Sequence, residues 1–168
     1  MAIISLQSHV EHALLFYDKG DVFFGIGRST PWEDELYPPA PSLTDTLEEA
    51  IGYKRSESRF LVVPDSSGAL MYKDTRWAIV NREDAEAMGA RWVYLSCYLS
   101  YSELNTAASY RQIGVFTGMQ TIEGLPESQS AFSPAEIANP GMLEVLDNRK
   151  PVYRDASQRE QLVLIIEF

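Results

Sequence analysis

The stretch of residues 91–101 alternates strictly between two kinds of side chain. One set is apolar and consists of Val93, Leu95, Cys97, Leu99 and Tyr101. The other set carries aromatic rings and hydroxyl groups and consists of Trp92, Tyr94, Ser96, Tyr98 and Ser100. A period of two is typical of a β-strand whose two faces meet different surroundings. The stretch therefore predicts a strand with one core face and one half-covered face, which suits a loop or a partner.

A strand needs neighbours to satisfy its backbone groups, and the sequence offers several. Apolar, β-branched and aromatic runs predict further strands at residues 22–26, 60–63, 69–73, 77–80 and 110–117. Residues 142–147 and 161–168 predict a last pair, joined like a hairpin through turn residues 148–151. Because residues 161–168 are apolar on both faces, they predict a central, covered strand. A Gly/Pro/Ser-rich loop is expected over residues 118–141.

Helices are expected at three places. Residues at helical spacing predict an N-terminal helix that ends near Gly20, and they are Leu6, Val10, Ala13, Leu14 and Tyr17. Residues 42–50 predict a short helix that Gly52 ends. Residues 81–88 predict one or two helical turns that end at Gly89.

The composition is that of an ordinary globular domain, with 45% hydrophobic and 23% charged residues. No repeat or linker divides the chain, so residues 1–168 are expected to form a single, mainly β domain. The formal net charge of −10 argues against nucleic acid and anionic membranes as partners. Neither a signal peptide nor an apolar run of about 20 residues is visible. The sole cysteine, Cys97, excludes an intramolecular disulfide and fits a protein made in a reducing cytoplasm.

Gly25-Ile26-Gly27 follows a predicted strand, as the start of a phosphate-binding turn would. However, the third glycine of that fingerprint is missing, and Pro31 stands where a helix should continue. A bulge, or the close approach of a neighbouring backbone, is the preferred interpretation of the two glycines.

Other candidates for chemistry are few. His9 and His12 lie three residues apart on the predicted helix, but no third metal ligand is specified. The acidic groups at 33–35 and 48–49 lack the spacing of a calcium loop and any second catalytic motif. Cys97 lies on an apolar strand face without an orienting histidine nearby in the sequence. We therefore expect no catalytic residue, no metal and no cofactor, and an enzyme is disfavoured.

The most distinctive passage is the loop that leaves the first strand. It begins with a turn at residues 29–32, continues through acidic residues and ends in the prolines Pro38, Pro39 and Pro41. Prolines remove amide donors and stiffen the chain, so this segment is poorly suited to pair within its own sheet but loses little entropy on another surface. Two interpretations of Trp32 and Tyr37 stay open: the rings pack on the domain's own core, or they anchor a partner.

Three passages of the chain resemble one protein family. Residues 24–32, which contain Gly-Arg-Ser-Thr-Pro-Trp, and the Pro-Pro-Ala-Pro-Ser step at 38–42 are similar to a signature of a baseplate wedge protein of contractile-tailed bacteriophages. Tyr-Arg-Gln-Ile at 110–113 is similar to a strand of the same family. Residues 141–151 and the hydrophobic strand that ends in Phe168 also resemble it. The passages follow the order of the family and span the chain.

Together with the predicted helices, the resemblance implies an antiparallel, immunoglobulin-like β-sandwich with an N-terminal helix and one or two short helices. It implies a homodimer and a non-enzymatic subunit of the virion tail baseplate, assembled in the host cytoplasm, that joins neighbouring baseplate and tail proteins. The segment between Val63 and Arg91 is short where long members of the family carry a large insertion. Contacts made through that insertion therefore do not transfer to this chain.

The candidate partner-binding residues lie on the loop and on the strand of residues 91–101. Arg28 is expected to hold the loop by hydrogen bonds to carbonyls or carboxylates, and Trp32 by filling an apolar socket. The remaining candidates are Glu33, Asp34, Tyr37, Pro38 and Pro39 on the loop and Trp92, Tyr94 and Tyr98 on the strand.

Three other functions compete with a baseplate role. A neck or collar protein is the second structural hypothesis, since such proteins also use small sandwich domains. A carbohydrate-binding module could use Trp92, Tyr94 and Tyr98 as a stacking platform for sugars. An enzyme that uses Glu33 or Asp34 is the least supported alternative.

Overall fold

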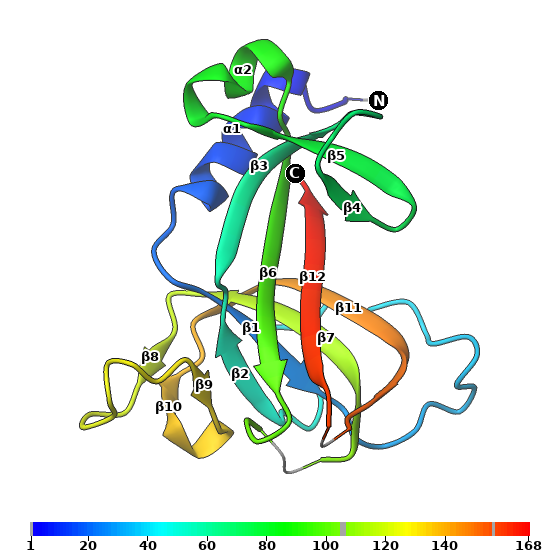
Figure 1. Cartoon of the computed structure of the whole chain (residues 1–168), viewed down its shortest axis with the longest axis vertical. Helices are drawn as coiled ribbons and strands as arrows, with labels where there is room; N and C mark the ends of the chain where they lie inside the picture. Colours follow the sequence, from blue (N-terminus) through cyan, green and yellow to red (C-terminus); the bar gives the residue numbers. More distant parts are fainter. Residues whose placement is uncertain (1, 105–106, 156) are drawn as a thin grey trace. The chain divides into compact units, whose positions relative to one another are not determined.

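The computed structural model describes residues 2–104, 107–155 and 157–168, and antiparallel strands are its main elements (Figure 1). The chain divides into two compact units. Unit 1 comprises Met1–Lys19, Glu57–Ser96 and Val163–Phe168, and unit 2 comprises Gly20–Ser56 and Cys97–Leu162. The helical elements are α1 (Leu6–Tyr17), the 3-10 turn η1 (Arg82–Asp84), α2 (Ala85–Met88) and the 3-10 turn η2 (Pro134–Glu136). The strands are β1 (Val22–Gly27), β2 (Gly52–Arg55), β3 (Ser58–Pro64), β4 (Leu70–Tyr72), β5 (Thr75–Val80), β6 (Trp92–Ser100), β7 (Ser109–Thr117), β8 (Gln120–Thr121), β9 (Ala131–Phe132), β10 (Ile137–Asn139), β11 (Met142–Tyr153) and β12 (Arg159–Glu167).

Helix α1 of unit 1 forms where the spacing of apolar residues predicts it. The Ser5 hydroxyl accepts a hydrogen bond from the Ser8 amide at 3.2 Å and so caps the first turn. The helix buries one stripe, made of Val10, Ala13 and Phe16. The Phe16 ring lies 5.0 Å from the Phe168 ring, between centroids. The predicted N-terminal helix is therefore confirmed.

The strands of unit 1 pair antiparallel around β3, which lies between β5 and β6. One group of aromatic side chains packs together there, with Trp77 and Tyr94 buried beside Val62. The helical turn predicted at residues 81–88 is confirmed as η1 and α2. It ends at Gly89, whose φ of 62° favours glycine.

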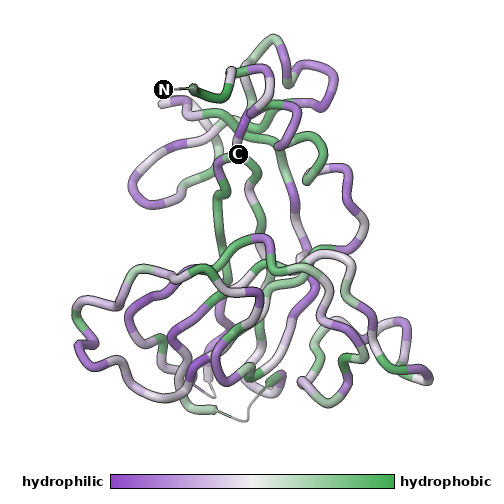
Figure 2. Tube along the Cα trace, turned by 180° about the vertical axis from the view of Figure 1, so that it is seen from behind, coloured by the Kyte–Doolittle hydropathy of each residue, from purple (hydrophilic) through white to green (hydrophobic). Residues whose placement is uncertain are grey.

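Unit 2 contains a five-stranded antiparallel sheet in the order β11-β7-β1-β2-β9. Figure 1 shows β1, β7 and β11 side by side in this sheet, and Figure 2 shows green, hydrophobic stretches along strands of both units. One hydrophobic core cluster of this unit consists of Phe23, Leu47, Tyr53, Phe116 and Phe132. A mainly β, antiparallel fold is thus confirmed, whereas the immunoglobulin-like arrangement stays a prediction.

The helix predicted for residues 42–50 is wrong, because this segment has no helix. Leu47 instead turns into the core of unit 2, where its Cδ1 lies 2.7 Å from the place that a Cβ on Gly25 would occupy. Glu49 has a φ of 47°, in the left-handed region that a right-handed helix does not use. Gly52 does not end a helix but begins β2. Tertiary contacts therefore override the local capping pattern.

The hairpin predicted near the C-terminus is also wrong. Strand β11 pairs with β7 and not with β12. It continues through residues 148–151, where its pairing with β7 changes register, and it ends at Tyr153. Strand β12 stands beside β6 at the edge of a different sheet, so it is not a central strand. The loop expected over residues 118–141 contains three short strands and η2.

Strand β6 has the core face that its alternation predicts. Val93, Leu95, Cys97 and Leu99 are fully buried. The other face is more covered than expected, because Tyr94 and Ser96 are buried as well, whereas Tyr98 keeps 38% of its surface exposed.

Candidate partner-binding site

The loop that leaves β1, here called the pinned loop (residues 28–46), projects from unit 2 and is drawn in light blue in Figure 1. Its two ends are joined by backbone hydrogen bonds. The Arg28 amide donates to the Glu48 carbonyl at 2.7 Å, and the Ile51 amide donates to the Ile26 carbonyl at 2.9 Å. Arg28 has a φ of 55°, which a residue with a side chain rarely adopts. The loop therefore leaves the sheet through a sharply turned, closed base.

The Arg28 side chain holds this base together. Its guanidinium donates to the Glu48 carboxylate and, at 3.3 Å, to the Pro31 carbonyl. The same group lies over the Trp32 ring, 3.9 Å from the ring centroid. Such a cation–π contact adds to the two hydrogen bonds and fixes the ring. These are the carboxylate and carbonyl contacts that the sequence predicts for Arg28.

Trp32 points back into its own unit and keeps only 7% of its surface exposed. Its Nε1 donates to the Arg149 carbonyl of β11 at 2.9 Å. Of the two interpretations left open for this ring, the structure supports packing on the core of its own unit. Any role of Trp32 in binding a partner is therefore indirect, because the ring fixes the loop and does not itself offer a surface.

Glu49 fastens the first turn of the pinned loop. Its carboxylate accepts hydrogen bonds from the Ser29 hydroxyl at 3.0 Å, from the Thr30 amide at 2.9 Å and from the Thr30 hydroxyl at 2.5 Å. Donors that converge on the charged form stabilise it. The hydroxyl and amide of Thr30, followed by the Ser29 hydroxyl, lower the pKa of Glu49 from 4.5 to about 2.

Arg111 of β7 holds the acidic part of the loop. Its side chain is buried and donates to both carboxylate oxygens of Glu35, at distances between 2.6 and 3.0 Å. It also donates to the Ser29 carbonyl at 2.7 Å. The hydrogen bonds from Arg111 lower the pKa of the Glu35 carboxyl group. A planar guanidinium that binds both oxygens fixes a carboxylate in position as well as in charge.

Gln112, the next residue on β7, connects three segments of unit 2. Its Oε1 accepts a hydrogen bond from the Glu48 amide at 2.8 Å, and its Nε2 donates to Asn148 Oδ1 at 2.9 Å. Asn148 Nδ2 in turn donates to the Pro39 carbonyl at 3.0 Å. The loop is therefore tied to β7 and β11 near its middle as well as at its base.

The middle of the loop is open to solvent. Leu36 keeps 65% of its surface exposed and Tyr37 keeps 79%, while Leu43 is fully exposed. Glu33 and Asp34 are also exposed, and Asp34 accepts a local hydrogen bond from the Leu36 amide at 2.9 Å. The side chains that hold the loop and the side chains that it presents are thus different sets.

The predicted platform on β6 does not form as three open rings. Tyr94 is buried and stacks on Phe60 within unit 1, and Trp92 is half-buried and in T-shaped contact with Trp77. Tyr98 is the exposed ring of the three, and the Arg159 guanidinium lies 4.3 Å from its centroid within unit 2. This arrangement gives little support to a sugar-stacking site.

The candidates for chemistry find structural explanations. A Cβ on Gly25 would lie 2.7 Å from the Leu47 and Phe116 side chains, so side-chain packing accounts for this glycine. A Cβ on Gly27 would lie 2.7 Å from the Glu48 carbonyl oxygen, which is the close backbone approach that the sequence predicts. Gly27 leads into the pinned loop and not into a helix. Cys97 is buried. Over the described parts of the chain, no three His, Cys, Asp or Glu side chains are grouped as metal ligands, and no helix is long and apolar enough to span a membrane.

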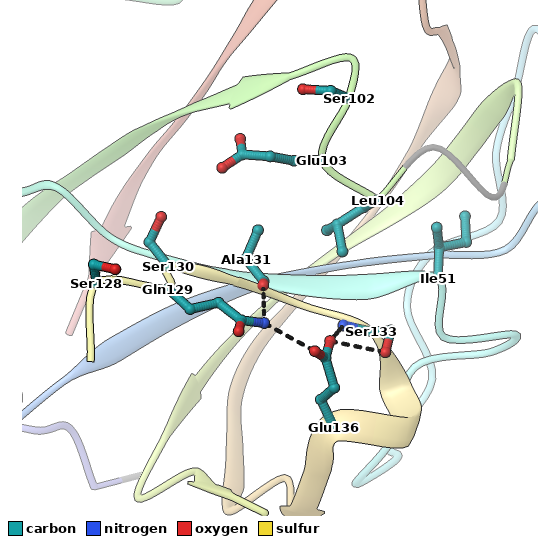
Figure 3. Close-up of a pocket in the computed structure, with 10 residues that line it drawn as sticks. All are labelled: Ile51, Ser102, Glu103, Leu104, Ser128, Gln129, Ser130, Ala131, Ser133 and Glu136. Carbon is teal, nitrogen blue, oxygen red and sulfur yellow. Dashed lines mark hydrogen bonds between the residues drawn. The ribbon is translucent and has the colours of Figure 1, made fainter. Parts of the chain in front are cut away.

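Unit 2 also has an open pocket of about 450 Å³ (Figure 3). Its walls carry hydroxyls, an amide and two carboxylates, from Ser102, Glu103, Ser128, Gln129, Ser130, Ser133 and Glu136. Both carboxylates are already bound within the chain. Glu103 accepts from Lys54 at 2.7 Å, and Glu136 accepts from Ser133 and Gln129. These hydrogen bonds hold both carboxylates in place within unit 2.

Sequence reasoning missed much of the group that pins the loop, because its members come from distant positions. The missed residues are Glu35, Glu48, Glu49, Arg111, Gln112 and Asn148. One signal was present. The passages that resemble a phage family include Arg111, Gln112 and Asn148. Parts of these passages lie on β1, β7 and β11, which are neighbours in one sheet.

The lowered pKa of Glu49 predicts how its contribution to stability depends on pH. Because the folded pKa of Glu49 lies below 4.5, the folded chain keeps this carboxylate charged where the unfolded chain takes up a proton. Its contribution is complete above pH 4.5 and is lost as the pH falls toward 2. We expect Glu49→Gln to melt below the wild type at neutral pH, and the gap in Tm to close toward pH 2. Melting curves across this range measure it; a gap that stays constant would contradict the role of Glu49. Glu127→Gln, at an exposed position, is the control and should match the wild type throughout.

Comparison with known proteins gives the same family as the motifs of the sequence. A family model described as "Baseplate wedge 3 tail fiber network component" matches residues 1–168. "Virion protein 3" of Enterococcus phage phiEF24C is 30% identical over 177 residues, which cover 99% of this chain and 96% of that protein. The resemblance to baseplate wedge proteins is thereby confirmed. The chain belongs to the family of baseplate wedge 3 tail fiber network components, structural proteins of the phage tail baseplate.

Proposed function

We propose that this chain joins neighbouring proteins of the tail baseplate, and that the middle of its pinned loop docks on one of them. The observation that carries this proposal is that different side chains hold the loop in place and face the solvent. Arg28, Trp32 and Arg111 fix it from within, while Leu36 and Tyr37 project into solvent. Exposed apolar and aromatic side chains on a fixed backbone bind at a lower entropy cost than the same side chains on a mobile one.

The charges of the loop indicate the chemistry of the partner. The carboxylates of Glu35, Glu48 and Glu49 are hydrogen-bonded within unit 2. Glu33 and Asp34 are exposed beside Leu36 and Tyr37, on a chain whose formal net charge is −10. A surface with basic side chains around an apolar socket is complementary to this arrangement. The exposed candidates Glu33, Asp34, Tyr37 and Pro39 would contact it, with Pro38 beside them.

We further propose that the subunit is a non-enzymatic homodimer and that its 168 residues form a single domain of immunoglobulin-like character. Membership in a structural baseplate family supports the absence of catalysis. The resemblance of the three motifs supports the dimer and the sandwich. The family assignment favours the baseplate over the neck or collar, and the buried Tyr94 gives no support to a carbohydrate-binding module.

The docking role predicts a loss of assembly without a loss of folding. Tyr37→Ser combined with Leu36→Ser removes two exposed anchors, so stability should change by no more than about 0.5 kcal/mol. Co-assembly with the other baseplate proteins should fall by about tenfold or more, since buried aromatic anchors carry most of the binding energy. Size-exclusion chromatography of the co-expressed proteins measures this. Leu15→Ser, at a similarly exposed position of unit 1, is the matched control and should assemble as the wild type does.

A further inference from the structure

Strand β12 has the sequence of a central strand but lies at the edge of its sheet. It is the outermost strand in the order β12-β6-β3-β5-β4, and Figure 1 draws it in red beside β6. Residues 162–166 are all apolar and alternate between the two faces of the strand. Those on one face are buried, and those on the other are half-buried against the cluster of Val62, Trp77 and Tyr94. Edge strands are normally shortened, charged or covered, so an apolar edge of this kind is suited to a further neighbour.

The outer side of β12 has no neighbouring strand among the described residues. The Phe168 amide donates to the Arg91 carbonyl at 3.0 Å, on the side of β6. Successive residues of a strand turn their N–H and C=O groups to opposite sides. The backbone groups of residues 160, 162, 164 and 166 therefore face β6, and those of residues 159, 161, 163, 165 and 167 face outward. This edge is nine residues long, whereas β4 at the other edge of the sheet has three.

The sequence of β12 is complementary to itself when two copies run antiparallel. Val163 is the middle of the nine residues, so the two-fold arrangement that pairs the whole strand sets Val163 opposite the partner's Val163. Because the backbone groups of Val163 face outward, this register makes the hydrogen-bonded kind of antiparallel pair. On the other face, Leu162 lies opposite the partner's Leu164. Apolar side chains therefore meet apolar side chains on both faces at the centre of the strand.

The same register matches the charges at the two ends of β12. Arg159 lies opposite the partner's Glu167, and opposite charges at directly opposed positions stabilise an antiparallel pair. The Arg159 side chain is exposed, and its guanidinium lies over the Tyr98 ring. Glu167 accepts a hydrogen bond from Arg91 through Oε1 at 2.8 Å, yet its side chain keeps 57% of its surface exposed. A carboxylate has lone pairs for further donors, so the partner's Arg159 adds to this contact without replacing it.

We propose that two copies of this chain associate through their β12 strands, which pair antiparallel around Val163 and join two sheets into one. This proposal rests on the homodimer of the proposed function and names the surface that forms it. That surface is different from the exposed middle of the pinned loop. Backbone pairing supplies affinity, and the side chains of the two strands set the register. In the dimer β12 becomes a central strand, as its two apolar faces predict.

Cysteine cross-linking of the full chain tests the register. Val163→Cys should give a covalent dimer under mild oxidation, because directly opposed residues have Cα atoms about 5.5 Å apart, within the span of a disulfide. Gln161→Cys is the matched control and should give none. It lies opposite the partner's Ile165, so its own two copies are about 14 Å apart. Both variants keep the buried Cys97, which should not cross-link in the wild type.

Gln161→Pro tests the backbone pairing without a change in the core. Gln161 is exposed and its amide faces outward, where an edge strand tolerates proline. The Kd of the dimer, measured by sedimentation, should rise about tenfold or more, because each copy loses an outward donor and carries a ring on its edge. Gln161→Ala keeps the amide and should dimerise as the wild type does. Circular dichroism verifies that both variants fold.

Sedimentation of the wild type separates this proposal from the homodimer itself. If the chain is a dimer but Val163→Cys does not cross-link, or Gln161→Pro dimerises normally, the homodimer stands and its formation through β12 is wrong. A chain that stays monomeric overturns both. A strand of another virion protein on β12 in the assembled baseplate would also overturn the pairing of two copies. The double variant at Leu36 and Tyr37 leaves β12 unchanged and should dimerise as the wild type does; loss of its dimer would move the contact to the loop.

Discussion

Replacing Trp32 by alanine should lower the free energy of unfolding by about 3 kcal/mol or more, the usual cost of truncating a buried tryptophan. The ring is 7% exposed, and its removal would leave a cavity under the Arg28 guanidinium and an unpaired Arg149 carbonyl. The base of the pinned loop should then loosen, so assembly with baseplate proteins should fall too. Chemical denaturation gives the first value, and co-assembly gives the second.

Trp32→Phe is the control for this prediction. It keeps most of the buried surface and loses the hydrogen bond from Nε1 to the Arg149 carbonyl, so it should cost only about 1 kcal/mol. If Trp32→Ala leaves both folding and assembly unchanged, then Trp32 does not hold the loop and the role given to it is wrong.

Gln112→Leu should be the second most damaging change, with a loss of about 2 kcal/mol in the free energy of unfolding. Leucine has a similar shape but can neither accept from the Glu48 amide nor donate to Asn148. Gln112 is almost fully buried, so water cannot take the place of the lost partners. Equilibrium denaturation measures the loss.

The same substitution at Gln120, an exposed residue of β8 in the same unit, is the matched control and should change stability by no more than about 0.5 kcal/mol. Equal stabilities for the two leucine variants would show that the side-chain bridge from β7 to the loop contributes nothing.

Elements that depend on local pattern could be predicted from the sequence. Strand β6 follows from its alternation, and α1 follows from its helical spacing and the cap at Ser5. The prediction of the core face of β6 is confirmed, because a period of two assigns side chains to the two faces of a strand without knowledge of the neighbouring strands. The covering of its other face could not be predicted, because only the tertiary fold shows that Tyr94 is covered.

Elements decided by distant contacts could not be predicted. Residues 42–50 carry helical capping spacing, but Leu47 is buried in the core of unit 2 and Glu49 is held in a left-handed conformation. The local sequence of residues 148–151 is typical of a turn, but these residues lie within β11. The pairing of β11 with β7 changes register there and continues on the other side.

The candidate site was predicted in outline. The sequence identifies the loop, Arg28 and Trp32. It does not identify which residues Arg28 binds, or that Arg111 and Gln112 of β7 hold the loop. A hydrogen bond between Arg111 and Ser29 joins residues 82 positions apart, and no local pattern encodes it. Only the three family-like passages hinted that these strands belong together.

The central claim is that the exposed middle of the pinned loop holds this subunit against another baseplate protein. The most direct test is a cryo-EM reconstruction of the assembled baseplate at a resolution that shows side chains. We predict that another virion protein packs against Leu36 and Tyr37 and places basic side chains beside Glu33 and Asp34. A loop that faces solvent in the assembled baseplate, with the subunit held through other surfaces, would contradict the claim.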